Sequence, residues 1–281
     1  MQSFKQFCET ALQIDEKLVT FGKRAYPKFG QIVILAGGAG SGKGFVLSNL
    51  LGIEGNVLDV DALKALAIGS TKLASRIKQE TGIDIKDLNL NDSENVKKMH
   101  EILSDVYGIT KANQQRVFSG ALAADEDRKP NLIFDVTLKD LSKLEKITRN
   151  AQDLGYKKEN IHVVWVLNDV EMAKQQNLER DRVVPSEILL TTHEGAAITM
   201  ARIMDMGSNL SKYLDGDMYI VFNKRGEDTT TISSPNGGMY VLDANYLQVK
   251  KKGKRVMNRS DLTDEIRNKI RDYTPDTPTW G

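Results

Sequence analysis

Short apolar runs alternate with amphipathic segments along most of the chain. The runs at residues 31–36, 131–135, 161–167 and 218–222 have the length and the β-branched or aromatic character of buried strands. Between them, apolar residues recur every three or four positions, which is typical of helices packed on a sheet. Since parallel strands are joined by crossover helices, the pattern predicts an α/β fold, a three-layer sandwich whose mainly parallel central sheet is closed by the strand at 218–222.

Helical patterns also occur outside this predicted core. Residues 3–20 carry the apolar stripe of a surface helix, and residues 62–120 are mostly helical, with a loop and a helix-start signal at 89–94. A short strand at 56–61 comes directly before the second of these stretches and contains two aspartates near its end. We expect residues 62–120 to form a helical insertion or cap.

The pattern changes after residue 225. Strand-like residues 229–233 and 238–242 flank the turn sequence Ser-Pro-Asn-Gly and predict a β-hairpin, which is followed by a basic run, a short helix and a tail that contains prolines. We therefore predict a main domain at residues 1–225, which includes the N-terminal helix and the cap, and a C-terminal extension at residues 226–281.

Composition narrows the class of protein only slightly. The chain has 281 residues, of which 40% are hydrophobic and 27% charged, and its formal net charge is +1, so it has globular composition and no global charge that favours nucleic acid or a membrane surface. Its single cysteine, Cys8, excludes an internal disulfide, and the three histidines lack metal-ligand spacing. The sequence has no signal peptide pattern and no long apolar stretch, which predicts a soluble cytoplasmic protein without a membrane segment.

A glycine-rich segment follows the first predicted strand and precedes a helix. The segment GGAGSGK, residues 37–43, fits the pattern G-x-x-x-x-G-K. Glycines let backbone N–H groups turn around a phosphate, the helix adds its positive end, and Lys43 neutralises charge on the outer phosphates. The segment predicts a site for the phosphates of ATP, with GTP as the alternative. The predicted contacts are Gly37, Gly38, Ala39, Gly40, Ser41, Gly42, Lys43, Gly44 and Phe45.

The residue after the lysine departs from the usual pattern. A serine or threonine hydroxyl at this position usually binds Mg²⁺, but the sequence has Gly44. The ending GSGKG resembles adenylate kinases, which place a threonine next, whereas this chain has Phe45. We predict that Mg²⁺ is reached through waters held by Ser41, Asp59 and Asp135, the last of which ends an apolar strand.

Two charged clusters are candidates for the second substrate and for catalysis. Asp59 and Asp61 follow the second strand, where a carboxylate could orient an acceptor hydroxyl, although Asp61 could instead cap a helix while Asp59 is solvated. Arg180 and Arg182 precede Pro185 at a helix-to-loop junction, where cations could close over a transferring phosphate. The alternative for the arginines is solvated surface charge.

These motifs favour phosphoryl transfer over the other reactions of phosphate-binding loops. A GTPase would carry an Asn-Lys-x-Asp motif that reads the base, and the sequence has none; Asn168-Asp169 lacks the lysine. The order of the motifs resembles the zeta-toxin group of P-loop kinases, relatives of polynucleotide kinases and chloramphenicol phosphotransferases. The resemblance covers about residues 30–225. Its four signatures are residues 37–43, 55–64, 132–140 and 182–187.

The resemblance implies roles for individual residues. Lys43 and Arg182 would stabilise the transferring phosphate, Asp61 would be the base that orients the acceptor, and Asp135 would lie beside the metal. The sequence has no arginine at the expected second lid position. Residues that could replace it are Arg180, His193 and Arg202.

The predicted function is therefore ATP-dependent phosphotransfer to a hydroxyl of a small molecule, a nucleotide or a nucleotide sugar. The resemblance does not carry the family's UDP-sugar specificity to this chain, because no motif establishes that pocket. One alternative is a polynucleotide or DNA-base kinase that contacts nucleic acid through Tyr246 and the basic run Lys250–Arg255. Another is a nucleotide-binding regulatory protein with weak or no transfer activity, which Gly44 and the incomplete lid would suit.

Overall fold

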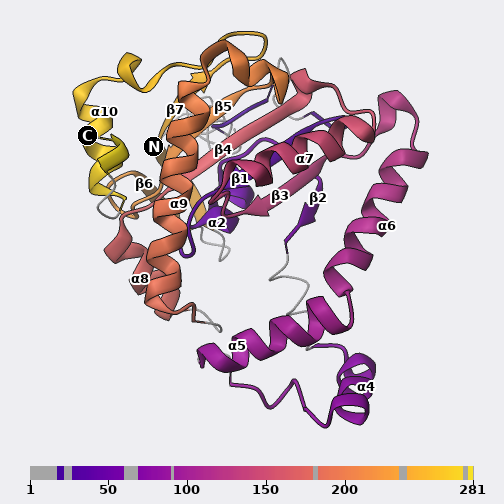
Figure 1. The fold of residues 1–281 in the computed structure, drawn as a ribbon. Helices are drawn as coiled ribbons and strands as arrows, with labels where there is room; N and C mark the ends of the chain where they lie inside the picture. The colour runs from indigo at the N-terminus through magenta and orange to yellow at the C-terminus, as the bar shows by residue number, and fades with distance from the viewer. Residues whose placement is uncertain are drawn as a thin grey trace, which may run out of the picture.

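The computed structural model describes residues 18–21, 27–59, 69–89, 92–179, 183–233, 239–274 and 278–280. Within these residues a seven-stranded sheet has the order β2-β3-β1-β4-β5-β7-β6 (Figure 1). The first five strands in this order are parallel, whereas β7 pairs antiparallel with both β5 and β6. The strands are β1 (Ile32–Ala36), β2 (Asn56–Leu58), β3 (Leu132–Val136), β4 (Ile161–Leu167), β5 (Met218–Phe222), β6 (Thr229–Ser233) and β7 (Met239–Lys250).

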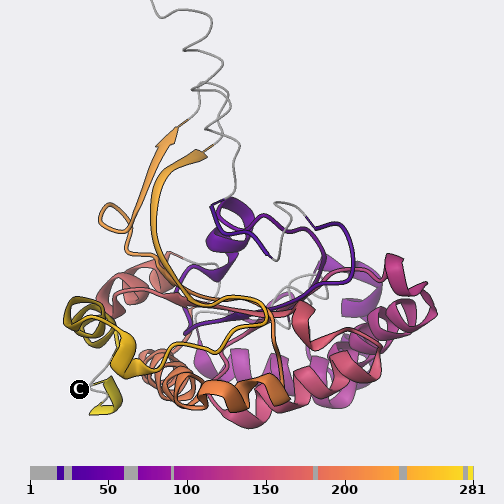
Figure 2. The same cartoon turned by 90° about the horizontal axis from the view of Figure 1, so that it is seen from above.

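Helices cover both faces of the sheet and form the predicted α/β sandwich, which is confirmed. Figure 2 shows α2 on one side of the sheet and α7 and α9 along the other. The α-helices are α2 (Lys43–Asn49), α4 (Thr71–Thr81), α5 (Ser93–His100), α6 (Ile109–Ala123), α7 (Leu141–Asp153), α8 (Val170–Leu178), α9 (Ser186–Asp205) and α10 (Asp264–Asp272). A π-helix spans Glu101–Val106, and short 3₁₀ turns lie at Glu126–Arg128, Lys158–Asn160, Gly207–Lys212, Arg259–Asp261 and Pro278–Trp280. No described helix is long and apolar enough to cross a membrane.

The two faces of the sheet bury separate cores. Along β1, Ile32 and Ile34 point into the core under α7 and α9, while Val33 and Leu35 point into the core under α2. This alternation is the period-two pattern of a strand that is buried on both faces. It explains why β1 is an unbroken apolar run in the sequence and why β4 is apolar except for the buried His162.

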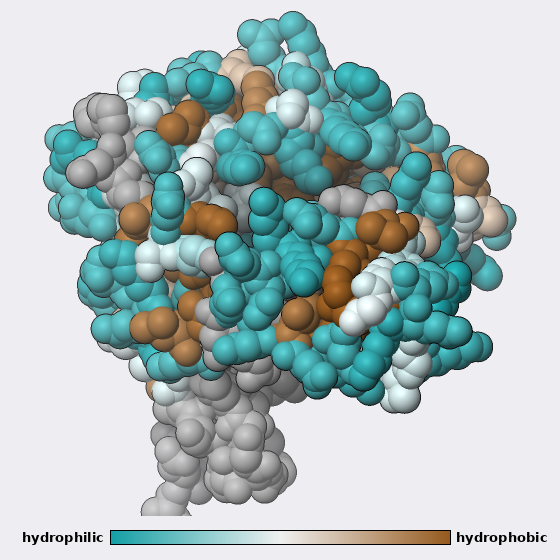
Figure 3. Space-filling view, turned by 60° about the horizontal axis from the view of Figure 1, so that its bottom comes forward, coloured by the Kyte–Doolittle hydropathy of each residue, from teal (hydrophilic) through white to brown (hydrophobic). Residues whose placement is uncertain are grey.

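The predicted cap contains helices with a small core of their own. The buried side chains Ala74, Ile77, Ile85, Met99, Ile102 and Leu103 form a separate cluster. In Figure 1, α4 and α5 lie away from the sandwich and are joined to it through α6. On the face drawn in Figure 3, hydrophilic side chains predominate and apolar ones form small separate groups, as on most soluble domains.

Predictions about the edge of the sheet, the two ends of the chain and the domain division have different outcomes. The expectation that β5 closes the sheet was wrong, because β7 extends well beyond the predicted hairpin strand and pairs with β5. The predicted tail contains Trp280, which is only 2% exposed and stacks on Trp165 at 5.7 Å between ring centroids. The predicted N-terminal helix falls largely outside the described residues; within them, Val19 and Phe21 are buried against the α2 core. The division at residue 225 stays a prediction.

Candidate nucleotide-binding site

The glycine-rich loop connects β1 to α2 at the carboxyl edge of the parallel strands. Gly42 caps α2 with a left-handed backbone (φ 85°), and Gly40 is also left-handed (φ 74°). A Cβ atom on Gly40 would lie 2.5 Å from the carbonyl oxygen of Ala173 on α8. Both backbone angle and close packing therefore require glycine at position 40.

Side chains from four elements hold the carbonyl groups of this loop. Lys43 Nζ donates to the carbonyl oxygens of Gly37 (3.0 Å) and Gly38 (3.2 Å). Three further side chains bond the next carbonyls in turn; they are His193 to Ala39 (2.8 Å), Asn168 to Gly40 (3.4 Å) and Asn223 to Ser41 (2.9 Å). Asn168 follows β4, Asn223 follows β5, and His193 lies on α9. The loop's shape is thus fixed by the protein itself.

The helix that follows the loop offers its positive end to an anion. In this described segment no side chain caps α2, and its first turn carries no acidic residue. Its first N–H groups therefore have no intrahelical partner, and the helix dipole favours negative charge there. Together with Lys43, these groups can bind the phosphates of a nucleotide.

Lys43 lies between the loop and the adjacent strand. Its Nζ is 3.6 Å from Oδ1 of Asp135, and the two side chains are 14% and 18% exposed. Asp135 occupies β3 next to Leu35 of β1, so the parallel register brings the two groups together. The structure therefore joins two of the predicted site residues in one ion pair.

Oxygen ligands suitable for Mg²⁺ are present near the loop. Ser41 Oγ is buried and has no hydrogen-bond partner among the described residues, and the same holds for Asn168 Oδ1. Asp59 and Asp135 line one cavity. In the described part of the chain, no group of three or more His, Cys, Asp or Glu side chains could hold a metal alone. The donors present fit an ion that keeps several waters and binds substrate phosphates, which is the usual state of Mg²⁺.

A cavity of about 110 Å³ lies beside Asp135 and could receive a second substrate. Strands β2 and β3 supply its acidic end, with Asp59 and Asp135, and helices α6 and α7 supply amide and ammonium groups. Its lining residues are Leu58, Asp59, Asn113, Gln114, Phe134, Asp135, Val136, Lys143, Lys146, Ile147 and Asn150. The cavity thus contains two carboxylates, of which Asp135 pairs with Lys43, and the cationic side chains Lys143 and Lys146.

A smaller cavity of about 80 Å³ lies beside the start of α2. It is lined by Gly42, Phe45, Gln176, Asn223, Arg225, Thr229 and Thr231. Phe45, which stands where adenylate kinases have threonine, therefore contributes an aromatic ring next to the loop. Strand β6 of the hairpin contributes to the same cavity, so the C-terminal extension reaches the predicted nucleotide site.

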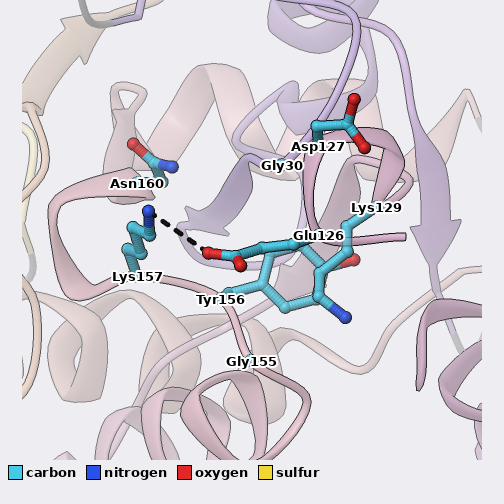
Figure 4. A pocket seen from close by; sticks show the side chains of 8 residues that line it. All are labelled: Gly30, Glu126, Asp127, Lys129, Gly155, Tyr156, Lys157 and Asn160. Carbon is cyan, nitrogen blue, oxygen red and sulfur yellow. Dashed lines mark ion pairs between the residues drawn. The ribbon is translucent and has the colours of Figure 1, made fainter. Parts of the chain in front are cut away.

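Another cavity, of about 430 Å³, lies at the opposite edge of the sheet, where β1, β3 and β4 begin (Figure 4). Across it, Lys157 pairs with Glu126 at 3.3 Å, and buried Lys129 donates to the carbonyl oxygen of Ala121 near the end of α6. The two lysines that line this cavity thus have partners within the protein. The cavity is separate from the P-loop, which follows the other end of β1.

The predicted catalytic residues and lid cations have different outcomes. Asp61, Arg180 and Arg182 lie outside the described residues, so their roles stay predictions. Arg202 is exposed in the last turn of α9, about 13 Å along the helix from His193. His193 itself is buried under the loop, and burial lowers its pKa, so it is uncharged at neutral pH and does not supply a lid cation.

The basic run has partners inside the protein. Lys250 is buried and pairs with Asp215 at 2.7 Å, Lys252 pairs with Glu159 at 3.2 Å, and Arg255 pairs with Asp261 at 3.3 Å. These ion pairs neutralise three cations that the nucleic-acid alternative needs. The nucleic-acid alternative stays a prediction, in which the exposed Lys251 and Lys254 would contact the phosphates.

Thr192, which accepts a hydrogen bond from the N–H of Ala39 at 3.1 Å, also holds the loop. The loop-holding roles of Asn168, Asn223, Thr192 and His193 were not predicted from sequence, where His193 was named only as a candidate lid cation. Asn168 and Asn223 each follow an apolar strand directly, as Asp135 ends one, and that position could have marked them because parallel strands end at one edge. Thr192 and His193 sit within a helix, where the pattern gives no comparable signal.

Fold and loop together define a nucleotide-binding P-loop protein of the α/β class. The family model described as zeta toxin matches residues 68–229, more than half of the chain, and the chain therefore belongs to the zeta-toxin family. The match begins after the P-loop, so the two pieces of evidence are independent. No curated protein matches the chain in sequence.

The AvrRxo1 structures share the fold at low sequence identity. The crystal structure of AvrRxo1-ORF1:AvrRxo1-ORF2 with sulphate ions has a TM-score of 0.51 and 14% identity to this chain. The matched region covers 88% of this chain and 65% of the chain in that structure. The structure of the same complex with ATP has a TM-score of 0.50, 13% identity, and 89% and 65% coverage. A structure from the PezAT toxin-antitoxin system of Streptococcus pneumoniae has a TM-score of 0.41, 12% identity, and 78% and 77% coverage. The chain thus spans 65% of the AvrRxo1-ORF1 structures it matches.

Proposed function

We propose that this chain is an ATP-dependent kinase that transfers the γ-phosphate to a hydroxyl of a small molecule, a nucleotide or a nucleotide sugar. The observation that carries the proposal is the pair of Lys43 and Asp135, 3.6 Å apart, at a cavity that also contains Asp59. Phosphoryl transfer needs a cation on the transferring group and acidic groups for the metal and the acceptor, all in one place. Membership of the zeta-toxin family and the ATP bound in the AvrRxo1 complex support the same reaction.

Each residue would act through ordinary electrostatics or hydrogen bonding. The loop N–H groups and Lys43 would bind the phosphates, and Arg182, with Arg180, would add positive charge as the phosphoryl group moves. Asp61 would accept a hydrogen bond from the acceptor hydroxyl and so orient it. When bound, Mg²⁺ would neutralise charge on the phosphates, and Asp59, Asp135 and Ser41 would hold its waters.

The acceptor cavity favours a molecule that is itself anionic. Lys143 and Lys146 lie on its α7 wall, and the amides of Asn113, Gln114 and Asn150 can bond a base or a sugar. The two lysines would attract a phosphate of the acceptor, and Asp59 in the same cavity would lie near its hydroxyl. A nucleotide or nucleotide sugar therefore suits this cavity better than an uncharged alcohol.

Transfer of label from [γ-³²P]ATP to a panel of nucleosides, nucleotides, nucleotide sugars and DNA oligonucleotides tests the proposal. We expect labelled product with phosphorylated acceptors, and its loss in the Lys43→Ala, Asp61→Asn and Arg182→Ala variants. Lys212→Ala, which removes an exposed lysine outside both cavities, is the matched control. Transfer that survives both Asp61→Asn and Arg182→Ala would contradict the assigned roles, and ATP binding without transfer to any acceptor would favour the regulatory alternative.

A further inference from the structure

Helix α9 bonds both polar groups of one residue in the P-loop. Thr192 Oγ1 accepts a hydrogen bond from the N–H of Ala39 at 3.1 Å and donates to the carbonyl oxygen of Leu189 at 2.7 Å. The neighbouring His193 donates from Nε2 to the carbonyl oxygen of Ala39 at 2.8 Å. A carbonyl oxygen can only accept, so Nε2 carries the proton.

These two bonds act on different peptide units. The N–H of Ala39 belongs to the peptide that joins it to Gly38, and its carbonyl belongs to the peptide that joins it to Gly40. Because both neighbours are glycines, each of these peptides could rotate at little steric cost. Rotation of the first peptide would break the bond from Ala39 N–H to Thr192 and turn the Gly38 carbonyl away from Lys43, and rotation of the second would break the bond from His193 to the Ala39 carbonyl. Thr192 and His193 together prevent both rotations.

The imidazole of His193 also packs flat against the loop. A Cβ atom on Gly38 would overlap its ring atoms Cδ2, Cγ and Nε2, and His193 is only 3% exposed. The ring therefore occupies the space that a side chain at position 38 would need. The contact is close enough to transmit the position of α9 to the loop.

Helix α9 is a rigid base for such a contact. Its next turns bury Ala197, Met200 and Ala201 in the main core. Two residues from His193, Gly195 lies against Lys139, which comes three residues after the end of β3, and a Cβ on Gly195 would lie 2.7 Å from Lys139 Cβ. The same helix thus sets the P-loop and the turn after Asp135 relative to each other.

We propose that Thr192 and His193 are positioning residues that hold the two peptides around Ala39 in the conformation that binds nucleotide phosphates. The proposal rests on the proposed function for the presence of a nucleotide, but it concerns binding and does not depend on transfer. Neither residue lines the cavity beside Asp135. Their loss should weaken ATP binding before it affects the acceptor.

The test compares variants that keep or lose one hydrogen bond. Thr192→Val removes the hydroxyl at constant shape, and Thr192→Ser keeps it; His193→Phe removes the N–H and keeps a ring, and His193→Gln keeps a donor at similar reach. We expect the Val and Phe variants to raise the Kd for ATP and the KM for ATP about five- to tenfold each, and the Ser and Gln variants to stay within about threefold. The KM for the acceptor should not change.

The matched controls are Thr191→Val and His100→Phe. Thr191 is exposed on the same helix and donates to the carbonyl oxygen of Glu187, whereas His100 is exposed on α5 in the cap. Both should bind ATP like the wild type. Thermal unfolding of every variant distinguishes the positioning role from a merely structural one. In a merely structural role, the Val and Phe variants would lose stability while their folded fraction binds ATP normally.

The outcomes distinguish this proposal from the proposed function. If the wild type binds ATP and Thr192→Val and His193→Phe bind it equally well, the positioning role is overturned and the kinase proposal stands. If transfer fails for every acceptor but the variants weaken ATP binding as expected, the positioning role stands without the kinase. If the wild type binds no nucleotide, both are overturned.

Discussion

Replacing Gly44 with serine should lower the magnesium concentration that nucleotide binding requires. Gly44 is the second residue of α2 and is exposed, its φ is not positive, and a Cβ atom built there meets no atom within 4 Å. A side chain can therefore be added without strain. In other P-loop proteins the hydroxyl at this position binds Mg²⁺ directly.

The substitution should have two effects, one on the stability of the fold and one on metal binding, and the alanine variant separates them. Removing a helical glycine stabilises the fold by about 0.5–1 kcal/mol, which corresponds to a rise in Tm of about 2 °C for a chain of this size. Gly44→Ala should show this effect alone. Gly44→Ser should add an oxygen ligand to the metal, which we expect to lower the half-saturating Mg²⁺ concentration about tenfold, equivalent to about 1.4 kcal/mol.

The assay is ATP binding by calorimetry at a series of Mg²⁺ concentrations, with Tm measured on the same samples. Because alanine has the backbone effect without the hydroxyl, the difference between the two variants isolates the metal ligand. Identical Mg²⁺ dependence in Gly44→Ser and Gly44→Ala would refute the reasoning, since the hydroxyl would then not reach the metal.

Three further perturbations test other parts of the structure. Gly40→Ala should weaken ATP binding at least tenfold, because its φ is 74° and a Cβ would meet Ala173, whereas Gly44→Ala should not; equal binding by both would contradict the loop geometry. Burial lowers the pKa of His162 to about 4, so the unfolded chain binds more protons between about pH 4 and 6.5, and stability should fall by up to about 3 kcal/mol as the pH falls through that range. In urea unfolding at several pH values, the unfolding free energy of His162→Gln should depend less on pH than that of the wild type. An unchanged pH dependence would show that His162 is not its source. Trp280→Ala should cost about 3–5 kcal/mol of unfolding free energy because its ring is buried on Trp165; a cost under about 1 kcal/mol in the same assay would show that the terminal turn is not part of the core.

The sheet and the P-loop could be predicted because both depend on local patterns. Strands buried on two faces leave continuous apolar runs, and a phosphate loop needs glycines and a lysine at fixed spacing. Lys43 and Asp135 were each predicted at the site, but their ion pair was not; it forms because β1 and β3 are parallel neighbours that end at one edge.

Other features depend on contacts between distant segments. Strand β7 pairs with β5 over residues 245–250, which lie after the predicted hairpin strand at 238–242, so its length could not be inferred from the hairpin turn alone. Trp280 is buried because a terminal turn returns to Trp165, more than one hundred positions earlier. The bonds from Thr192 and His193 to Ala39 join residues that are far apart in sequence, and helix periodicity does not distinguish these two polar residues from solvated ones.

The two sides of the candidate site are built from elements of different kinds, and this should affect how its specificity can change. The loop is held by Asn168 and Asn223, which follow central strands, and by α9, whose inner face is core. The acceptor cavity is walled by α6 and α7, where Asn113 and Lys143 project from helix surfaces. Substitutions on those surfaces leave the sheet untouched, whereas changes at the loop disturb buried hydrogen bonds. Under the proposed function, acceptor specificity could therefore change by substitutions that leave the phosphate-binding loop intact. The residues that determine acceptor specificity should be sought on α6 and α7.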